Sequence, residues 1–265
     1  MIFLANSYEE GYNDKSCVCK IIINGVLFIM KKLKYLFVFG IILAAAFFIG
    51  KDKIMQKAQV LRLEFLSEMK EAAMIEDVPF IKQLPELPRG CEVTSLAMLL
   101  QYKGVQVDKM QLASEIHRVP FEQNGVRGNP YEGFVGNIYT KAEPGYGVYN
   151  KPIFDLAEKY VPEKVINLTG RDMQDIYKVI SSGSPVWVII NTTFKPLAES
   201  SFETWNTSSG EVKITYYEHS AVVIGYDQNF VYVNDPLKNN PRLAVPRAEF
   251  EKAWEQMGKQ AITIL

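Results

Sequence analysis

Cysteine and histidine are scarce in this chain of 265 residues, which holds three cysteines and two histidines. Cys17 and Cys19 form a Cys-x-Cys pair, but no further cysteine or nearby histidine completes a set of zinc ligands. The sequence therefore predicts no metal site and no cofactor. Cys91 is the only cysteine after residue 19.

An excess of charge of either sign is also missing, because the net charge is -1 with 22% charged residues. Proteins that bind nucleic acid through phosphate contacts usually carry a clear basic excess, so we expect no nucleic-acid partner. The chain does have 48% hydrophobic residues and enough length for one substantial globular core.

One long run lacks charge altogether: "YLFVFGIILAAAFFIG" at 35–50 follows the basic stub "MKKLK" at 30–34. A basic stub before a long apolar run is typical of a secretory signal or a membrane anchor, and both interpretations of 30–50 stay open. Either one predicts that the rest of the chain lies outside the cytoplasm, attached to the membrane if the segment is not cleaved. Export signals usually begin near the start of a chain, so we interpret 1–29 as a mis-assigned start region and Met30 as the alternative initiator.

Residues 51–77 are expected to form a helical stalk or linker, because Leu61, Phe65 and Met69 recur at fourfold spacing among alternating charges. The globular domain is expected to span 78–265 and to begin with a short strand at 78–81.

The domain has the pattern of an α+β fold, with N-terminal helices packed on a mostly antiparallel sheet. Helices are predicted at 92–102, 108–116, 152–160, 171–182 and 247–257, and strands at 185–191, 212–217, 220–226, 230–235 and 261–265. Between them, 125–152 holds nine glycine or proline residues and reads as a long irregular loop. Loops of that length usually carry function, so this one is a candidate wall of a binding cleft.

Cys91 is predicted at the first turn of a helix, since Pro88 and Gly90 disfavour helix before it. The partial positive charge of a helix N-terminus lowers the pKa of a thiol and favours the reactive thiolate. The alternative is a small apolar residue in a packed turn, which is the commoner role of a single cysteine.

A thiolate nucleophile needs a base, and His219 is the better placed of the two histidines. It opens "HSAVVIGYDQNFVYVNDP", which reads as two strands joined by a tight turn. If Tyr226 pairs with Phe230, Asp235 lies diagonally across from His219 on the same face, within reach of its imidazole. His117, beside a proline at a predicted helix end, is expected to be a cap or a surface residue.

The order Cys, His, Asp resembles that of the papain-like cysteine peptidases, and more closely that of exported relatives of peptidase family thirty-nine, which process bacteriocin leaders after double glycine. The resemblance spans about 78–265 and rests on "IKQLPELPRGCEVTSLAMLLQYKGVQVDK", "NPYEGFVGNIY", "GYGVYNKPI" and "EHSAVVIGYDQNFVYVNDPL". It implies a papain-like fold, Cys91 as nucleophile, His219 as general base, Asp235 as the residue that orients it, and Gln83 as a side-chain donor to the oxyanion.

The chain departs from transporter-linked leader peptidases, which have Asp-Cys-Gly where this sequence has Gly90-Cys91-Glu92, and it contains no P-loop motif. As a residue of the first helical turn, Glu92 is expected to face solvent. Aromatic residues of the long loop are candidates for substrate subsites: Tyr131, Phe134, Tyr146 and Tyr149.

The function expected from these features is that of an extracytoplasmic thiol hydrolase, a cysteine peptidase acting on a peptide or protein. Two alternatives stay open: a non-catalytic surface-binding domain on the same fold, and an amidase or acyltransferase with the same thioester chemistry. Neither the substrate nor the oligomeric state follows from the sequence.

Overall fold

The computed structural model describes residues 68–265 of the chain. The segments 1–29 and 30–50, and 51–67 of the expected stalk, therefore lie outside the described residues. Within 68–265, none of the helices combines the length and the apolar character needed to span a bilayer. Residues 68–77 contain no helix, so the helical prediction is wrong for this part of 51–77. Here Ala73–Met74 form strand β1 instead, pairing with the central sheet.

That sheet has seven strands, and every pairing in it is antiparallel. Its order is β12 (Leu243–Pro246), β11 (Phe230–Asn234), β10 (Glu218–Tyr226), β7 (Val186–Asn191), β13 (Ala261–Ile264) and β6 (Val165–Asn167), with β1 added to β10. The five predicted helices are present as α2 (Cys91–Tyr102), α3 (Lys109–Glu115), α4 (Asn150–Tyr160), α5 (Met173–Ser181) and α6 (Arg247–Gln256). The predicted α+β class is confirmed.

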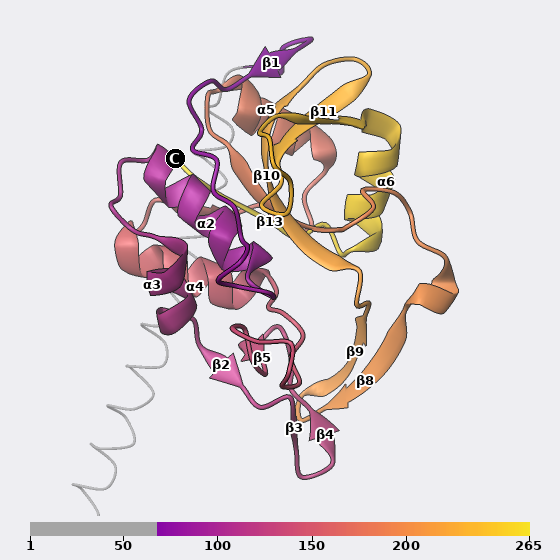
Figure 1. The fold of residues 1–265 in the computed structure, drawn as a ribbon. Helices are drawn as coiled ribbons and strands as arrows, with labels where there is room; N and C mark the ends of the chain where they lie inside the picture. Colours follow the sequence, from indigo (N-terminus) through magenta and orange to yellow (C-terminus); the bar gives the residue numbers. More distant parts are fainter. Residues whose placement is uncertain (1–67) are drawn as a thin grey trace, which may run out of the picture. The chain divides into compact units, whose positions relative to one another are not determined.

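Helices cover both faces of this sheet (Figure 1), with α2, α3 and α4 on one side and α5 and α6 on the other. Alternation along β7 explains the two cores, because successive side chains of a strand point to opposite faces. Trp187 and Ile189 pack with α2 and α4, whereas Val186, Val188 and Ile190 pack with α5 and α6. A strand buried on both faces reads in sequence as the continuous apolar run that predicted it.

Local sequence signals also account for helix ends. Asp108 caps α3 as predicted, since its Oδ1 accepts hydrogen bonds from the N–H groups of Met110 and Gln111, both at 2.8 Å. The predicted strand at 78–81 is wrong, because these residues belong to no strand of the sheets within 68–265. Pro79 has no N–H to donate to a ladder. The side-chain amide of Asn234 binds the carbonyls of Val78 and Pro79 instead.

Two smaller sheets each take one strand from the predicted loop at 125–152, which is therefore not irregular throughout. One pairs β2 (Arg118–Val119) with β5 (Phe134–Val135), and the other joins β3 (Glu122–Gln123), β4 (Val126–Arg127), β8 (Glu203–Thr207) and β9 (Gly210–Ile214). A short 3-10 turn, η1, spans Glu199–Ser201. The predicted strand at 212–217 ends early at Ile214, and the exposed Tyr216 and Tyr217 lead into β10.

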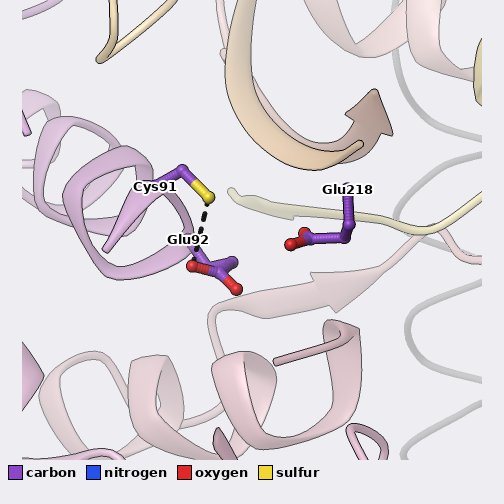
Figure 2. A group of neighbouring side chains, drawn as sticks. All are labelled: Cys91, Glu92 and Glu218. Carbon is purple, nitrogen blue, oxygen red and sulfur yellow. Dashed lines mark hydrogen bonds between the residues drawn. The ribbon is translucent and has the colours of Figure 1, made fainter. Parts of the chain in front are cut away.

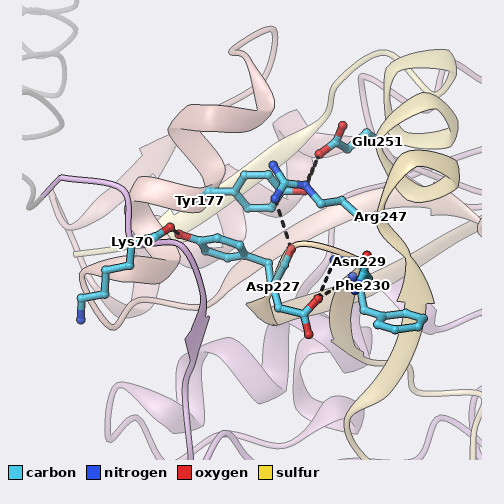
Figure 3. A network of polar contacts seen from close by, with 8 residues as sticks. Lys70, Tyr177, Asp227, Asn229, Phe230, Arg247 and Glu251 are labelled. Carbon is cyan, nitrogen blue, oxygen red and sulfur yellow. Dashed lines mark hydrogen bonds and ion pairs between the residues drawn. The ribbon is translucent and has the colours of Figure 1, made fainter.

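A polar network ties α6 to the turn between β10 and β11 (Figure 3). Arg247 donates from Nε to Glu251 at 2.8 Å and from Nη1 to the carbonyl of Asp227 at 3.2 Å, and its guanidinium lies 4.3 Å from the ring centre of Tyr177. The Asp227 carboxylate accepts from the N–H groups of Asn229 and Phe230, which closes the turn. The end of the hairpin farthest from His219 is thus fixed in place.

We predict that Leu96→Ala, which removes a fully buried side chain from α2, lowers the free energy of unfolding by about 2–5 kcal/mol. Met110→Ala on α3, where the side chain is 39% exposed, is the matched control and is expected to change it by less than about 1 kcal/mol. Urea unfolding followed by circular dichroism measures both. Equal losses in the two variants would contradict this account of the core.

Candidate active site

Cys91 is the first residue of α2, as predicted, and it is buried. Gly90 before it has no room for a side chain, because a Cβ there would lie 2.5 Å from the Cβ of Leu87. The indole N–H of Trp187 on β7 donates to the carbonyl of Glu92 at 3.0 Å. This hydrogen bond attaches the start of α2 to the centre of the sheet. Gly90, the residue before the helix, provides no side-chain cap.

His219 and Asp235 form a buried pair, 1% and 2% exposed, with Nε2 of the imidazole 2.7 Å from Oδ1 of the carboxylate. This pairing leaves Nδ1 of His219 free of Asp235. Burial raises the pKa of Asp235, but the hydrogen bond and charge of His219, the N–H of Leu237 and the charge of Lys238 outweigh it, and the pKa lies below its usual value. Asp235 is thus a carboxylate that can orient an imidazole and stabilise its charged form.

The hairpin that joins these residues has a bulge. Next to the turn, Tyr226 pairs with Val231 rather than with Phe230, so the predicted pairing is wrong there. An irregularity between Val223 and Gly225 shifts the register by one residue, and Val222 then pairs with Asn234. Toward His219 the register is therefore the predicted one, and the His219–Asp235 contact forms as the sequence indicated.

Gln83 lies in the loop before α2 and is 2% exposed. Its N–H donates to the carbonyl of Pro236 at 2.9 Å, and its carbonyl accepts from Nζ of Lys109 at 3.0 Å. The backbone of Gln83 is thereby tied both to the residue after Asp235 and to α3. Its side-chain Oε1 is buried with no hydrogen-bond partner among the described residues.

These side chains meet at one cleft of about 300 Å³. Its walls are Gln83, Pro88, Arg89, Cys91, Lys141, Gly145, Tyr146, Thr192, Tyr216, Glu218, His219 and Leu237. Gln83, Cys91 and His219 are therefore brought together, with Asp235 directly behind the histidine. His117 is exposed and lies outside the cleft.

The long loop does supply part of the cleft wall, through Lys141, Gly145 and Tyr146. Of the other aromatic candidates, Phe134 is fully buried in the core, so the subsite prediction is wrong for it. Tyr131 and Tyr149 line a separate groove beside Lys213. Tyr216 lines the active-site cleft and was missed, because its position just before β10 carries no sequence signal.

The expectation of a lowered thiol pKa is wrong for this arrangement. Burial raises the pKa of the Cys91 thiol well above its usual range, and the carboxyl groups of Glu92 and Glu218 raise it further. The N–H of Ser220 acts in the opposite direction. The effect of the helix N-terminus is outweighed by desolvation and by two neighbouring acids.

Both acids point toward the sulfur (Figure 2). Glu92 is fully buried, so the prediction that it faces solvent is wrong. Its Oε2 accepts from the Cys91 thiol at 3.2 Å and its Oε1 accepts from the N–H of Val148 at 2.7 Å. The Sγ of Cys91 and one carboxylate oxygen each of Glu92 and Glu218 all lie within 4.8 Å of one another. Glu218, next to His219 in sequence, is a second site residue that the sequence did not indicate.

Comparison with known proteins identifies relatives of this chain. The chain is 44% identical over 200 residues to YvpB of Bacillus subtilis (strain 168), a protein of uncharacterized function, covering 74% of this chain and 78% of YvpB. It also resembles a crystal structure from Bacillus anthracis whose protein is provisionally named a C39-like peptidase. The TM-score is 0.73 and the identity 58%, covering 74% of this chain and 98% of that one.

The sequence matches the Peptidase_C39 like family over residues 75–262, a span that contains the cysteine, the buried histidine–aspartate pair and the cleft between them. The chain belongs to the Peptidase_C39 like family.

Proposed function

We propose that this protein is an extracytoplasmic thiol hydrolase, and specifically a cysteine peptidase. The observation that carries the proposal is the single cleft lined by Gln83, Cys91 and His219, with Asp235 at 2.7 Å from the imidazole. A non-catalytic binding domain has no need of a buried histidine–aspartate pair beside a buried thiol. Membership of a peptidase-like family supports the same reaction class.

In the proposed reaction, Nδ1 of His219 takes the proton from the Sγ of Cys91, because Nε2 is held by Asp235. The thiolate attacks the carbonyl carbon of a peptide bond in the cleft. The imidazolium then gives its proton to the leaving amine, which leaves a thioester on Cys91. Water attacks the thioester, His219 takes up a proton from that water, and the acid product leaves with the thiol restored.

The oxyanion of each tetrahedral intermediate needs hydrogen-bond donors. Cys91 is the first residue of α2, so its N–H has no acceptor inside the helix. Gln83 lies in the same cleft wall and has a side-chain amide to donate. Hydrogen bonds to Pro236 and Lys109 hold its backbone, which fixes the position of the Cα atom from which the side chain extends. We assign Gln83 the second donor of the oxyanion hole.

The location outside the cytoplasm is part of the proposal. It is supported by the basic stub at 30–34 and the uncharged run at 35–50. In an oxidising compartment a lone thiol in the folded domain has no internal disulfide partner, which keeps Cys91 available for catalysis.

We predict that the full-length chain, purified in mild detergent, cleaves members of a peptide library and that Cys91→Ala abolishes the cleavage. Product masses separate hydrolysis from transfer to an amine, because only hydrolysis adds one water to the acyl fragment. Iodoacetamide labelling of Cys91, mapped by peptide mass spectrometry to separate it from Cys17 and Cys19, is expected in the folded protein. His219→Ala is expected to slow it. Unlabelled Cys91 in the folded protein would overturn the proposal.

We predict that Gln83→Ala lowers kcat by about 100- to 1000-fold, the usual effect of removing one oxyanion-hole donor. The rate of Cys91 alkylation by iodoacetamide is expected to change little, since alkylation develops no oxyanion. Peptide cleavage and alkylation are measured on the same preparation. A parallel loss of both rates would mean that Gln83 supports the fold of the cleft rather than the oxyanion.

A further inference from the structure

Glu92 and Glu218 have no place in the reaction described above, although they surround its nucleophile. Gly147 brings them together: a Cβ at this position would lie 2.5 Å from Oε1 of Glu92 and 2.7 Å from Oε2 of Glu218. Only glycine therefore leaves room for both carboxyl groups at this point. The two acids form a carboxyl pair, defined here as Glu92 and Glu218, packed between Cys91 and the loop at Gly147.

Two negative charges so close together, on a fully buried Glu92 and a partly buried Glu218, are unfavourable, so the pair retains a proton. Burial raises the pKa of Glu92 to about 7, against the hydrogen bonds that it accepts from its own N–H, from Val148 and from Cys91. Burial and the neighbouring Glu92 raise the pKa of Glu218 well above its usual value.

The hydrogen bonds decide which acid carries the charge. Glu92 accepts from Val148 and from the Cys91 thiol, and both bonds favour the carboxylate form. Oε1 of Glu218 is buried with no hydrogen-bond partner among the described residues, which disfavours a charge there. Above about pH 7 the proton therefore stays on Glu218 and the negative charge on Glu92, 3.2 Å from the sulfur.

We propose that the charge on Glu92 holds Cys91 in its thiol form, so that protonation of the carboxyl pair in mildly acidic solution releases the nucleophile to His219. Glu92 and His219 are then competing partners of one S–H group. With Glu92 charged, the thiol proton is held in the bond to Oε2. With Glu92 neutral, the same proton moves from Sγ to Nδ1 of His219 and gives the thiolate–imidazolium pair. The inference rests on the proposed function for the role of His219.

Other ionisable groups around the carboxyl pair are His219 with Asp235 from the β10–β11 hairpin, the hydroxyls of Tyr146 and Tyr149, and Arg89 and Lys141 at the cleft wall. Burial raises the pKa of both tyrosines, so they stay neutral in this range. The test keeps His219 unchanged and varies Glu92.

The test is the pH dependence of Cys91 alkylation in the full-length chain, with EDTA present to exclude metal binding to the thiol. Glu92→Gln removes the charge but keeps an oxygen acceptor for Val148. We expect it to raise the alkylation rate at about pH 8 by about tenfold, because a carboxyl group with a pKa of about 7 is then about nine-tenths ionised, and to change it little at about pH 5.5. Glu218→Gln mimics the protonated acid and is expected to keep the shape of the wild-type profile. Glu211→Gln, an exposed acid on β9, is the matched control.

Alkylation requires no substrate, so its outcome is independent of peptide cleavage. If Glu92→Gln leaves the profile unmoved while His219→Ala slows labelling, the inference is wrong and the proposed function stands. If Glu92→Gln slows labelling at both pH values while thermal unfolding is unchanged, Glu92 acts as the base of Cys91 and the inference is also overturned. If no peptide is cleaved but the Glu92→Gln profile shifts as expected, the proposed function fails and the control of Cys91 by Glu92 remains.

Discussion

The burial of the first turn of α2 is the constraint from which the cleft and its chemistry follow. All residues from Cys91 to Leu100 are buried, and the N–H groups of the first turn have no acceptor inside the helix. The helix start also has no side-chain cap. The carboxylate of Glu92 sits at the positive end of the helix and favours it electrostatically. Trp187 attaches the helix start to β7 by donating to the carbonyl of Glu92. The same contacts that anchor the helix fix the position of the sulfur relative to β7 and β10.

From this anchoring, the proposed nucleophile shares its cleft with two proton acceptors that belong to different parts of the fold. Glu92 belongs to the helix itself and contacts the sulfur directly. His219 belongs to the sheet and is held from behind by Asp235. Glu92 disfavours the thiolate, because two negative charges side by side are unfavourable in a buried site. His219 favours the thiolate, since an imidazolium neutralises the negative charge of the sulfur. Which partner prevails is decided by one proton on the carboxyl pair.

Periodic sequence signals predicted most of the fold, and local pairing predicted part of the site. The helices and the central strands are found where apolar periodicity and Asp108 indicated them. The His219–Asp235 contact follows from the hairpin. The pairing predicted at the turn was wrong by one residue, but the bulge shifts the register so that the pairing near His219 is the predicted one. Gln83 was found only through family resemblance, because a loop glutamine has no local pattern. Glu92 was misjudged because its position in the helix does not reveal that the loop at Val148 covers it. Such contacts join segments far apart in the chain, and no short-range pattern records them.

At its position, Glu92 is subject to two opposing requirements: the stability of the folded cleft and the reactivity of the Cys91 thiol. Its carboxylate accepts from the N–H of Val148 and interacts favourably with the helix dipole, and both effects stabilise the folded cleft more strongly while the group is charged. The thiolate is favoured only while the group is neutral. A residue fully ionised at every working pH would meet the first requirement and suppress the nucleophile, whereas an apolar residue would free the nucleophile and leave the Val148 N–H unpaired. Glu92, whose pKa is raised by burial beside a second acid, meets both requirements. Its charged form favours the stability of the cleft, and its neutral form favours the thiolate. Gly147, which admits the two carboxyl groups side by side, is therefore as necessary to the arrangement as the acids are.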